Sequence, residues 1–120
     1  MPKYLVSIHH PDDYDPSAEG EAMVRDISSL NKEMIAAGVR AFVGGLESAS
    51  KAKSLRAKPD GEVLITDGPY TESKEHVGGF WILETADMDE ALVWGSKAAK
   101  ACRAPVEVRA VFQKPPSAKP

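Results

Sequence analysis

The fold is decided by one stretch in the second half of the chain, Val77-Gly78-Gly79-Phe80-Trp81-Ile82-Leu83-Glu84. Apolar side chains occupy both alternating sides of this stretch, and its two glycines are followed by two aromatic residues. A strand with one solvated face alternates apolar and polar residues, whereas a strand packed on both faces is apolar nearly throughout. We therefore predict that residues 77–84 form the middle strand of a sheet.

Further strands are predicted on either side of this stretch. Three segments alternate apolar and polar residues in the manner of half-buried strands: residues 3–10, 39–46 and 106–112. Two shorter strand-like runs, residues 55–58 and 62–66, flank the sequence Pro59-Asp60-Gly61. Proline suits the second position of a turn and glycine the left-handed position, so these two runs are predicted to form a β-hairpin.

Two helices are predicted between these strands. The first is expected to begin at Asp15 and Pro16, an N-cap followed by a first-turn proline, and to end at Gly38. Its apolar stripe consists of Met23, Ile27, Leu30 and Met34. The second helix begins with the capping-box pair Asp87 and Glu90. Its packing face carries mostly small side chains, at Met88, Ala91, Leu92, Gly95, Ala98, Ala99 and Cys102.

The order of these elements predicts an α+β domain. Strand, helix, strand, hairpin, strand, helix, strand is the ferredoxin-like βαββαβ plan with an inserted β-hairpin, and that plan places both helices on one face of the sheet. The opposite face would then present side chains that include Leu5, Ser7, His9, Glu107, Arg109 and Val111. Because a monomer would expose an apolar patch there, we predict that this face packs against a two-fold copy in a homodimer.

Size and composition are those of a single globular domain. The chain has 120 residues, of which 42% are hydrophobic and 28% charged, with a net charge of -3. We predict one domain over residues 1–113, followed by a disordered tail over residues 114–120. The charge balance does not favour a nucleic-acid partner. The local basic run is expected on a solvated hairpin rather than at a phosphate site, and consists of Lys51, Lys53, Arg56 and Lys58.

The sequence also bears on cellular location and on bound cofactors. No run approaches the ~20 apolar residues that span a bilayer, so no membrane partner is expected. The single cysteine, Cys102, and an N-terminus without a signal-peptide pattern favour the cytoplasm. The acidic residues Asp12, Asp13, Asp15 and Glu19 lack the spacing of a calcium loop, and the glycine pairs lack that of a nucleotide loop. We therefore expect no metal and no cofactor.

The most distinctive motif comes just before the middle strand: Asp67-Gly68-Pro69-Tyr70-Thr71-Glu72-Ser73-Lys74-Glu75. In one interpretation Gly68-Pro69 forms a turn, Asp67 accepts backbone hydrogen bonds, and the loop has a structural role alone. In the other, Glu72 and Lys74 place an acid and a cation beside the sheet, where burial can move a pKa into a working range. The residues themselves leave both interpretations open.

His9 is the histidine with the strongest functional pattern. Alternation places it on the same face as Glu107 and Arg109, and a histidine near a carboxylate can transfer protons at neutral pH. The alternative is a partly buried histidine whose ring is satisfied by its neighbours in the sheet. His10 is expected to cap the end of the strand, and His76 is expected to be exposed.

The motif carries a family resemblance. Residues 67–80 resemble the signature of the DGPF branch of the YCII-related proteins, with Tyr70 where the family usually has phenylalanine. Four further segments are similar to the family's pattern, namely Lys3-Tyr4, Gly44-Gly45-Leu46, Asp89-Glu90-Ala91 and Glu107-Val108-Arg109. The resemblance implies a dimeric α/β barrel built from ferredoxin-like subunits, with a pocket between the sheet and the motif loop. It implies no unique function, because the wider barrel group includes isomerases, cofactor-free oxygenases and ligand-sensing domains.

The sequence thus predicts a homodimer that binds an unknown small molecule. The protein is expected to be either a cofactor-free acid–base enzyme or a non-catalytic ligand-sensing or protein-interaction module. The candidate catalytic residues are His9 and Glu72, either of which would move a proton. The candidate ligand-binding residues are Asp67, which shapes the loop, and Lys74 and Arg109, which would hold an anionic group.

Overall fold

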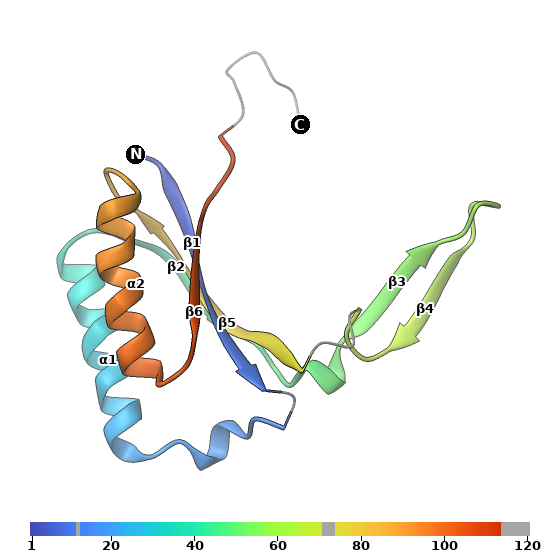
Figure 1. Ribbon diagram of the computed structural model, residues 1–120, viewed down its shortest axis with the longest axis horizontal. Helices are drawn as coiled ribbons and strands as arrows, with labels where there is room; N and C mark the ends of the chain where they lie inside the picture. Colours follow the sequence, from blue (N-terminus) through green and yellow to red (C-terminus); the bar gives the residue numbers. More distant parts are fainter. Residues whose placement is uncertain (12, 71–73, 114–120) are drawn as a thin grey trace.

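The computed structural model describes residues 1–11, 13–70 and 74–113 of the chain (Figure 1). The predicted tail at residues 114–120 and the candidate Glu72 lie outside these residues. The main sheet consists of β1 (Lys3–Pro11), β2 (Arg40–Gly45), β5 (Glu75–Glu84) and β6 (Val106–Ala110). The helices are α1 (Glu21–Ala36) and α2 (Met88–Cys102), and a separate two-stranded sheet contains β3 (Lys53–Ala57) and β4 (Val63–Asp67). Two short 3-10 turns are η1 (Pro16–Ala18) and η2 (Ala49–Lys51).

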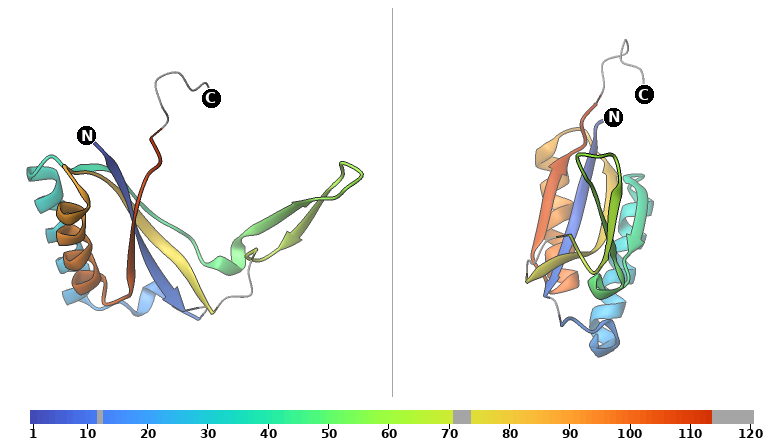
Figure 2. Two further views of the ribbon diagram at one scale, coloured as in Figure 1. Left: turned by 45° about the horizontal axis from the view of Figure 1, so that its top comes forward. Right: turned by 90° about the vertical axis from the view of Figure 1, so that its right-hand side faces the viewer.

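The main sheet has the strand order β2-β5-β1-β6, and every neighbouring pair is antiparallel. This is the order expected of a ferredoxin-like fold, which confirms the predicted α+β arrangement. β5 lies between β2 and β1, so the prediction that residues 77–84 form a middle strand is also confirmed. Both helices cover one face of the sheet (Figures 1 and 2).

The hydrophobic core lies between that face and the helices. Alternate residues of β1 point into it, as predicted, and Trp81 and Leu83 do so from β5. The predicted stripe of α1 packs onto these strands, with Met23, Leu30 and Met34 buried and Ile27 partly buried. On α2, a Cβ at Gly95 would come within 2.7 Å of Val108 Cγ2, so the helix can approach the sheet closely only with glycine there.

Two predictions about the helices need correction. Asp15 and Pro16 do not begin α1: the Asp15 side chain accepts a hydrogen bond from the Ser17 amide and caps η1, and α1 begins only after Gly20. The local cap is satisfied within one short turn, so it cannot by itself set the start of the longer helix. The second correction concerns the packing face of α2. Leu92, which was predicted to lie on that face, is 46% exposed, whereas Ala101, which was not predicted there, is buried in the core.

The end of α1 and the start of α2 follow the predictions. Gly38 has a φ of +72°, and its amide and that of the next residue bond to the carbonyls of Ile35 and Met34 to close α1. At α2 the Asp87 side chain accepts a hydrogen bond from the Glu90 amide at 2.9 Å.

Neither of the two α-helices in the described segments, α1 and α2, has the length and hydrophobicity needed to cross a membrane.

The predicted hairpin is present and projects from the domain. We call β3, β4 and their turn the arm. Lys58 donates its amide to the Glu62 carbonyl at 2.7 Å, and Gly61 has the positive φ that the turn requires, +91°. The arm stands away from the sheet face that carries no helix, which we call the open face (Figures 1 and 2). Its apolar side chains are exposed, including Leu55, Val63, Leu64 and Ile65.

Candidate functional site

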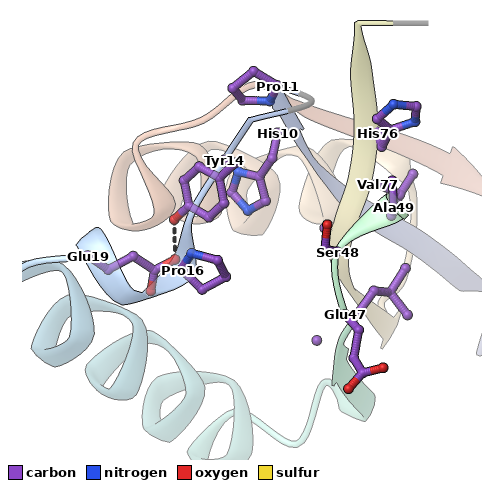
Figure 3. Close-up of a pocket in the computed structure, with 13 residues that line it drawn as sticks. His10, Pro11, Tyr14, Pro16, Glu19, Glu47, Ser48, Ala49, His76 and Val77 are labelled. Carbon is purple, nitrogen blue, oxygen red and sulfur yellow. Dashed lines mark hydrogen bonds between the residues drawn. The ribbon is translucent and has the colours of Figure 1, made fainter. Parts of the chain in front are cut away.

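A cleft opens at the end of β1, on the helix side of the sheet. The cleft consists of two adjoining cavities, and the outer one has a volume of about 230 Å³. One wall is formed by His10 at the end of β1 and by Tyr14 and Glu19 in the connection to α1. The facing wall includes Glu47 and Ser48, which follow β2 (Figure 3). Segments far apart in the sequence therefore meet at this cleft.

The His10 ring is positioned by an irregularity in strand pairing. The β1–β5 register shifts between Ile8, which pairs with Gly79, and His9, which pairs with Val77. Gly78 is thus an additional residue on β5, and a Cβ there would come within 2.0 Å of His10 Cδ2. The imidazole occupies the space that any other side chain at residue 78 would need.

Tyr14 packs against the same imidazole. The two rings are parallel within 3°, with centroids 3.7 Å apart. The Tyr14 hydroxyl donates a hydrogen bond to Glu19 Oε2. Burial, reinforced by this hydrogen bond and by the charge of Glu19, raises the pKa of Tyr14, so the phenol stays protonated and acts as a donor. His10, Tyr14 and Glu19 therefore form one connected group.

Burial also changes the pKa of His10. The pKa of His10 is lowered from its ordinary value, chiefly by desolvation; Glu19 opposes this shift and His9 adds to it. At neutral pH the imidazole is therefore uncharged, with one nitrogen able to accept a proton. A neutral imidazole beside a protonated phenol and a glutamate can both donate and accept hydrogen bonds.

A second cavity of about 190 Å³ continues the cleft between α1 and the sheet. It shares His10, Glu19, Gly45 and Gly78 with the first cavity. Its lining is mainly apolar and includes Ile8, Met23, Ile27 and Trp81. The cleft thus has a polar outer part and an apolar inner part, and both parts are included when we refer to the cleft below.

In the inner part of the cleft, hydrogen bonds fix the orientation of Trp81, and burial fixes the protonation state of Cys102. Trp81 Nε1 donates to Asn31 Oδ1 at 2.9 Å, and Arg40 donates to the same oxygen at 3.2 Å. Asn31 in turn donates to the Ile27 carbonyl, so its amide orients the indole. Burial raises the pKa of Cys102 to about 11, so its thiol is protonated at neutral pH.

The candidate His9 lies on the open face and not in the cleft. Ser7 Oγ and His9 Nε2 are 3.2 Å apart, and Ser7 is almost completely buried. β1 pairs Ser7 with Glu107 and Leu5 with Arg109, so both charged residues share the open face, as predicted. Arg109 Nε lies 4.0 Å from Glu107 Oε1.

The two described site candidates of the motif, Asp67 and Lys74, do not line the cleft. Asp67 ends β4 and forms an ion pair with Lys53 on the arm, where its side chain is 85% exposed. The Gly68 amide donates to the Ala52 carbonyl, and its φ of +95° favours glycine. Lys74 is exposed just before β5.

Sequence reasoning missed the group in the cleft. His10 was expected to cap a strand end, and Glu19 was considered among the acidic residues that lack the spacing of a calcium loop. A usable signal existed, because the alternation that places His9 on the open face places His10 on the same side as Ile8. His76 is half-buried and lines the cleft instead of being exposed.

Comparison with known proteins places the chain in a family. The chain is 36% identical over 74 residues to an uncharacterised protein of Rhizobium meliloti, a match that covers 62% of this chain and 59% of that protein. The match therefore spans less than two thirds of the relative's length. The model of the YCII-related domain matches residues 2–114, nearly the whole chain. The chain therefore belongs to the YCII-related domain family.

Proposed function

We propose that this YCII-related protein binds a small organic molecule in the cleft and carries out cofactor-free acid–base chemistry on it. The observation that carries the proposal is the connected group of His10, Tyr14 and Glu19, which lies where the polar and apolar parts of the cleft meet. Binding sites are typically concave and mostly apolar, with a few converging polar groups. The cleft has these properties.

The arrangement supports specific roles for the three side chains. Neutral His10 can accept a proton from a bound O–H, N–H or activated C–H group. The single hydrogen of the Tyr14 hydroxyl is donated to Glu19, so the Tyr14 oxygen can accept a hydrogen bond from a donor group of the bound molecule. If no proton is transferred to a reacting atom, the same cleft serves a non-catalytic ligand sensor, which is the rival function.

A second candidate site is the open face. The contact between Ser7 Oγ and His9 Nε2 favours it, and Arg109 could hold an anionic group there. Asp67, Glu72 and Lys74 of the motif would belong to this site if a second copy brought them to the sheet. The pocket would then lie between two subunits.

We also propose that the protein is a homodimer joined through the open face. The described chain places no helix over this face, and Phe42, 56% exposed, stacks there on Phe80 with ring centroids 5.8 Å apart. Pairing with a copy would remove such apolar surface from water. Light scattering at micromolar concentration should give the mass of a dimer, and a monomer would refute this part of the proposal.

The test of function is a thermal-unfolding screen with small organic acids, phenols and amines, followed by NMR detection of turnover. A ligand of the cleft should stabilise the wild type and His9→Gln but not His10→Gln. Consumption of that ligand by the wild type would support the enzyme, and unchanged ligand would support the sensor. Loss of stabilisation in His9→Gln with retention in His10→Gln would move the site to the open face.

A further inference from the structure

The charged groups of the cleft are acidic. Among the described residues that line its two parts, Glu19 and Glu47 carry carboxyl groups, and neither lysine nor arginine is present. Glu47 lies 3.9 Å from Lys51 in an exposed ion pair, whereas Glu19 accepts the Tyr14 hydroxyl inside the cleft. An anion that entered would leave water and meet groups of its own charge.

The inner part of the cleft favours an apolar body. The Trp81 indole is fixed by Asn31 and only 2% exposed, and Met23 and Ile27 of α1 line the same space. An aromatic ring gains dispersion and hydrophobic contact beside such side chains. A polar head at the other end of the molecule would reach His10 and Glu19, which line both parts.

We propose that the cleft selects an amphipathic molecule with a neutral or cationic head, an alcohol or an amine carried on an apolar ring, and discriminates against carboxylates. This inference rests on the proposed function, because it concerns the same cleft. Glu19 is the residue that distinguishes a cationic head from a neutral one. The predicted capture of an anionic group by Lys74 or Arg109 would belong to the open face instead.

Three probes that share one benzene ring test the inference: benzylamine, benzyl alcohol and benzoate. Each is titrated into the ¹⁵N-labelled full chain, and the amides of residues 78 and 79 and the indole N–H of Trp81 are followed by NMR. The indole of Trp94, which lies near Lys97 on α2 and is not among the described lining residues, serves as an internal reference. Benzylamine and benzyl alcohol should shift the Trp81 signal, with benzoate binding at least about tenfold more weakly.

A matched pair of variants tests the role of Glu19. Glu19→Gln can still accept the Tyr14 hydrogen bond but carries no charge, so benzylamine should lose its advantage over benzyl alcohol. Glu21→Gln makes the same charge change two residues away, at an exposed position outside the described lining, and should leave that advantage intact.

The outcomes separate the inference from the function on which it rests. Benzoate binding at Trp81 as tightly as benzylamine would overturn the ligand class while the cleft remained the binding site. Shifts confined to the open face, or no shift with any of the three probes, would overturn both. An unchanged benzylamine preference in Glu19→Gln would refute the assignment of that residue.

Discussion

The cleft and the arm use polar side chains in opposite ways. In the cleft, His10, Tyr14 and Glu19 contact one another in a partly buried space, where desolvation shifts the pKa of the histidine and of the phenol. On the arm, Asp67 and Lys53 pair while largely exposed to solvent. Burial strengthens electrostatic effects and exposure screens them. The most conspicuous motif in the sequence therefore begins on the arm, at a charged pair that is largely exposed to solvent.

The largest difference between the helix-covered core and the arm should be the free energy lost when an apolar side chain is shortened. Met34→Ala shortens a fully buried side chain of α1 that belongs to the hydrophobic core, and should lower the free energy of unfolding by about 2–5 kcal/mol. Leu55→Ala on the arm removes a side chain that is 59% exposed and should cost well under ~1 kcal/mol. Urea unfolding of both variants measures the difference. An equal cost would mean that the arm is packed against a partner in solution.

The next effect concerns the glycine beneath the histidine. Gly78→Ala should destabilise the protein by about 1–3 kcal/mol, because the new Cβ must displace the His10 ring. NOEs between the His10 and Tyr14 rings should be lost in the same variant. Gly45→Ala is the control, since a Cβ at residue 45 would meet nothing within 4 Å. Retained ring NOEs in Gly78→Ala would contradict the described geometry.

A smaller effect is expected from pH. Because the folded pKa of His10 lies below its value in the unfolded chain, the unfolded state binds more protons at mildly acidic pH. This group's contribution to stability is present above about pH 6.5 and declines as the pH falls toward the folded pKa. Chemical denaturation from pH 7.5 down to about 5 should show a shallower decline in His10→Gln than in the wild type. Identical slopes would argue against a buried imidazole.

The smallest effect belongs to the arm's ion pair. Asp67→Asn should change the free energy of unfolding by less than about 1 kcal/mol, and the difference should shrink as salt is added. Thermal unfolding at low and high ionic strength provides the measurement. A large loss that salt does not reduce would show that Asp67 has a structural role beyond its pairing with Lys53.

Much of the fold could be predicted because its signals are local. The two-sided apolar stretch identified the middle strand, and Gly38 and Gly61 marked a helix end and a turn through their need for positive φ. The start of α1 could not be predicted from Asp15, because that side chain completes its hydrogen bonds within a 3-10 turn.

The candidate site was harder to predict because it depends on contacts between distant segments. The additional Gly78 in the β1–β5 pairing makes room for His10, and the connection to α1 then brings Tyr14 onto the ring. Alternation gave the correct face for His9 and, extended by one residue, would have given the face of His10. The direction of the arm has no comparable local signal, because it depends on how the hairpin joins the sheet.

The central claim is that the ligand lies in the cleft on the helix side of the sheet. Its most direct measurement is a set of intermolecular NOEs between the protein and a ligand taken from the unfolding screen. The account predicts NOEs to the rings of His10, Tyr14 and Trp81. NOEs to Leu5 and Ile82 on the open face, with none to those rings, would contradict it.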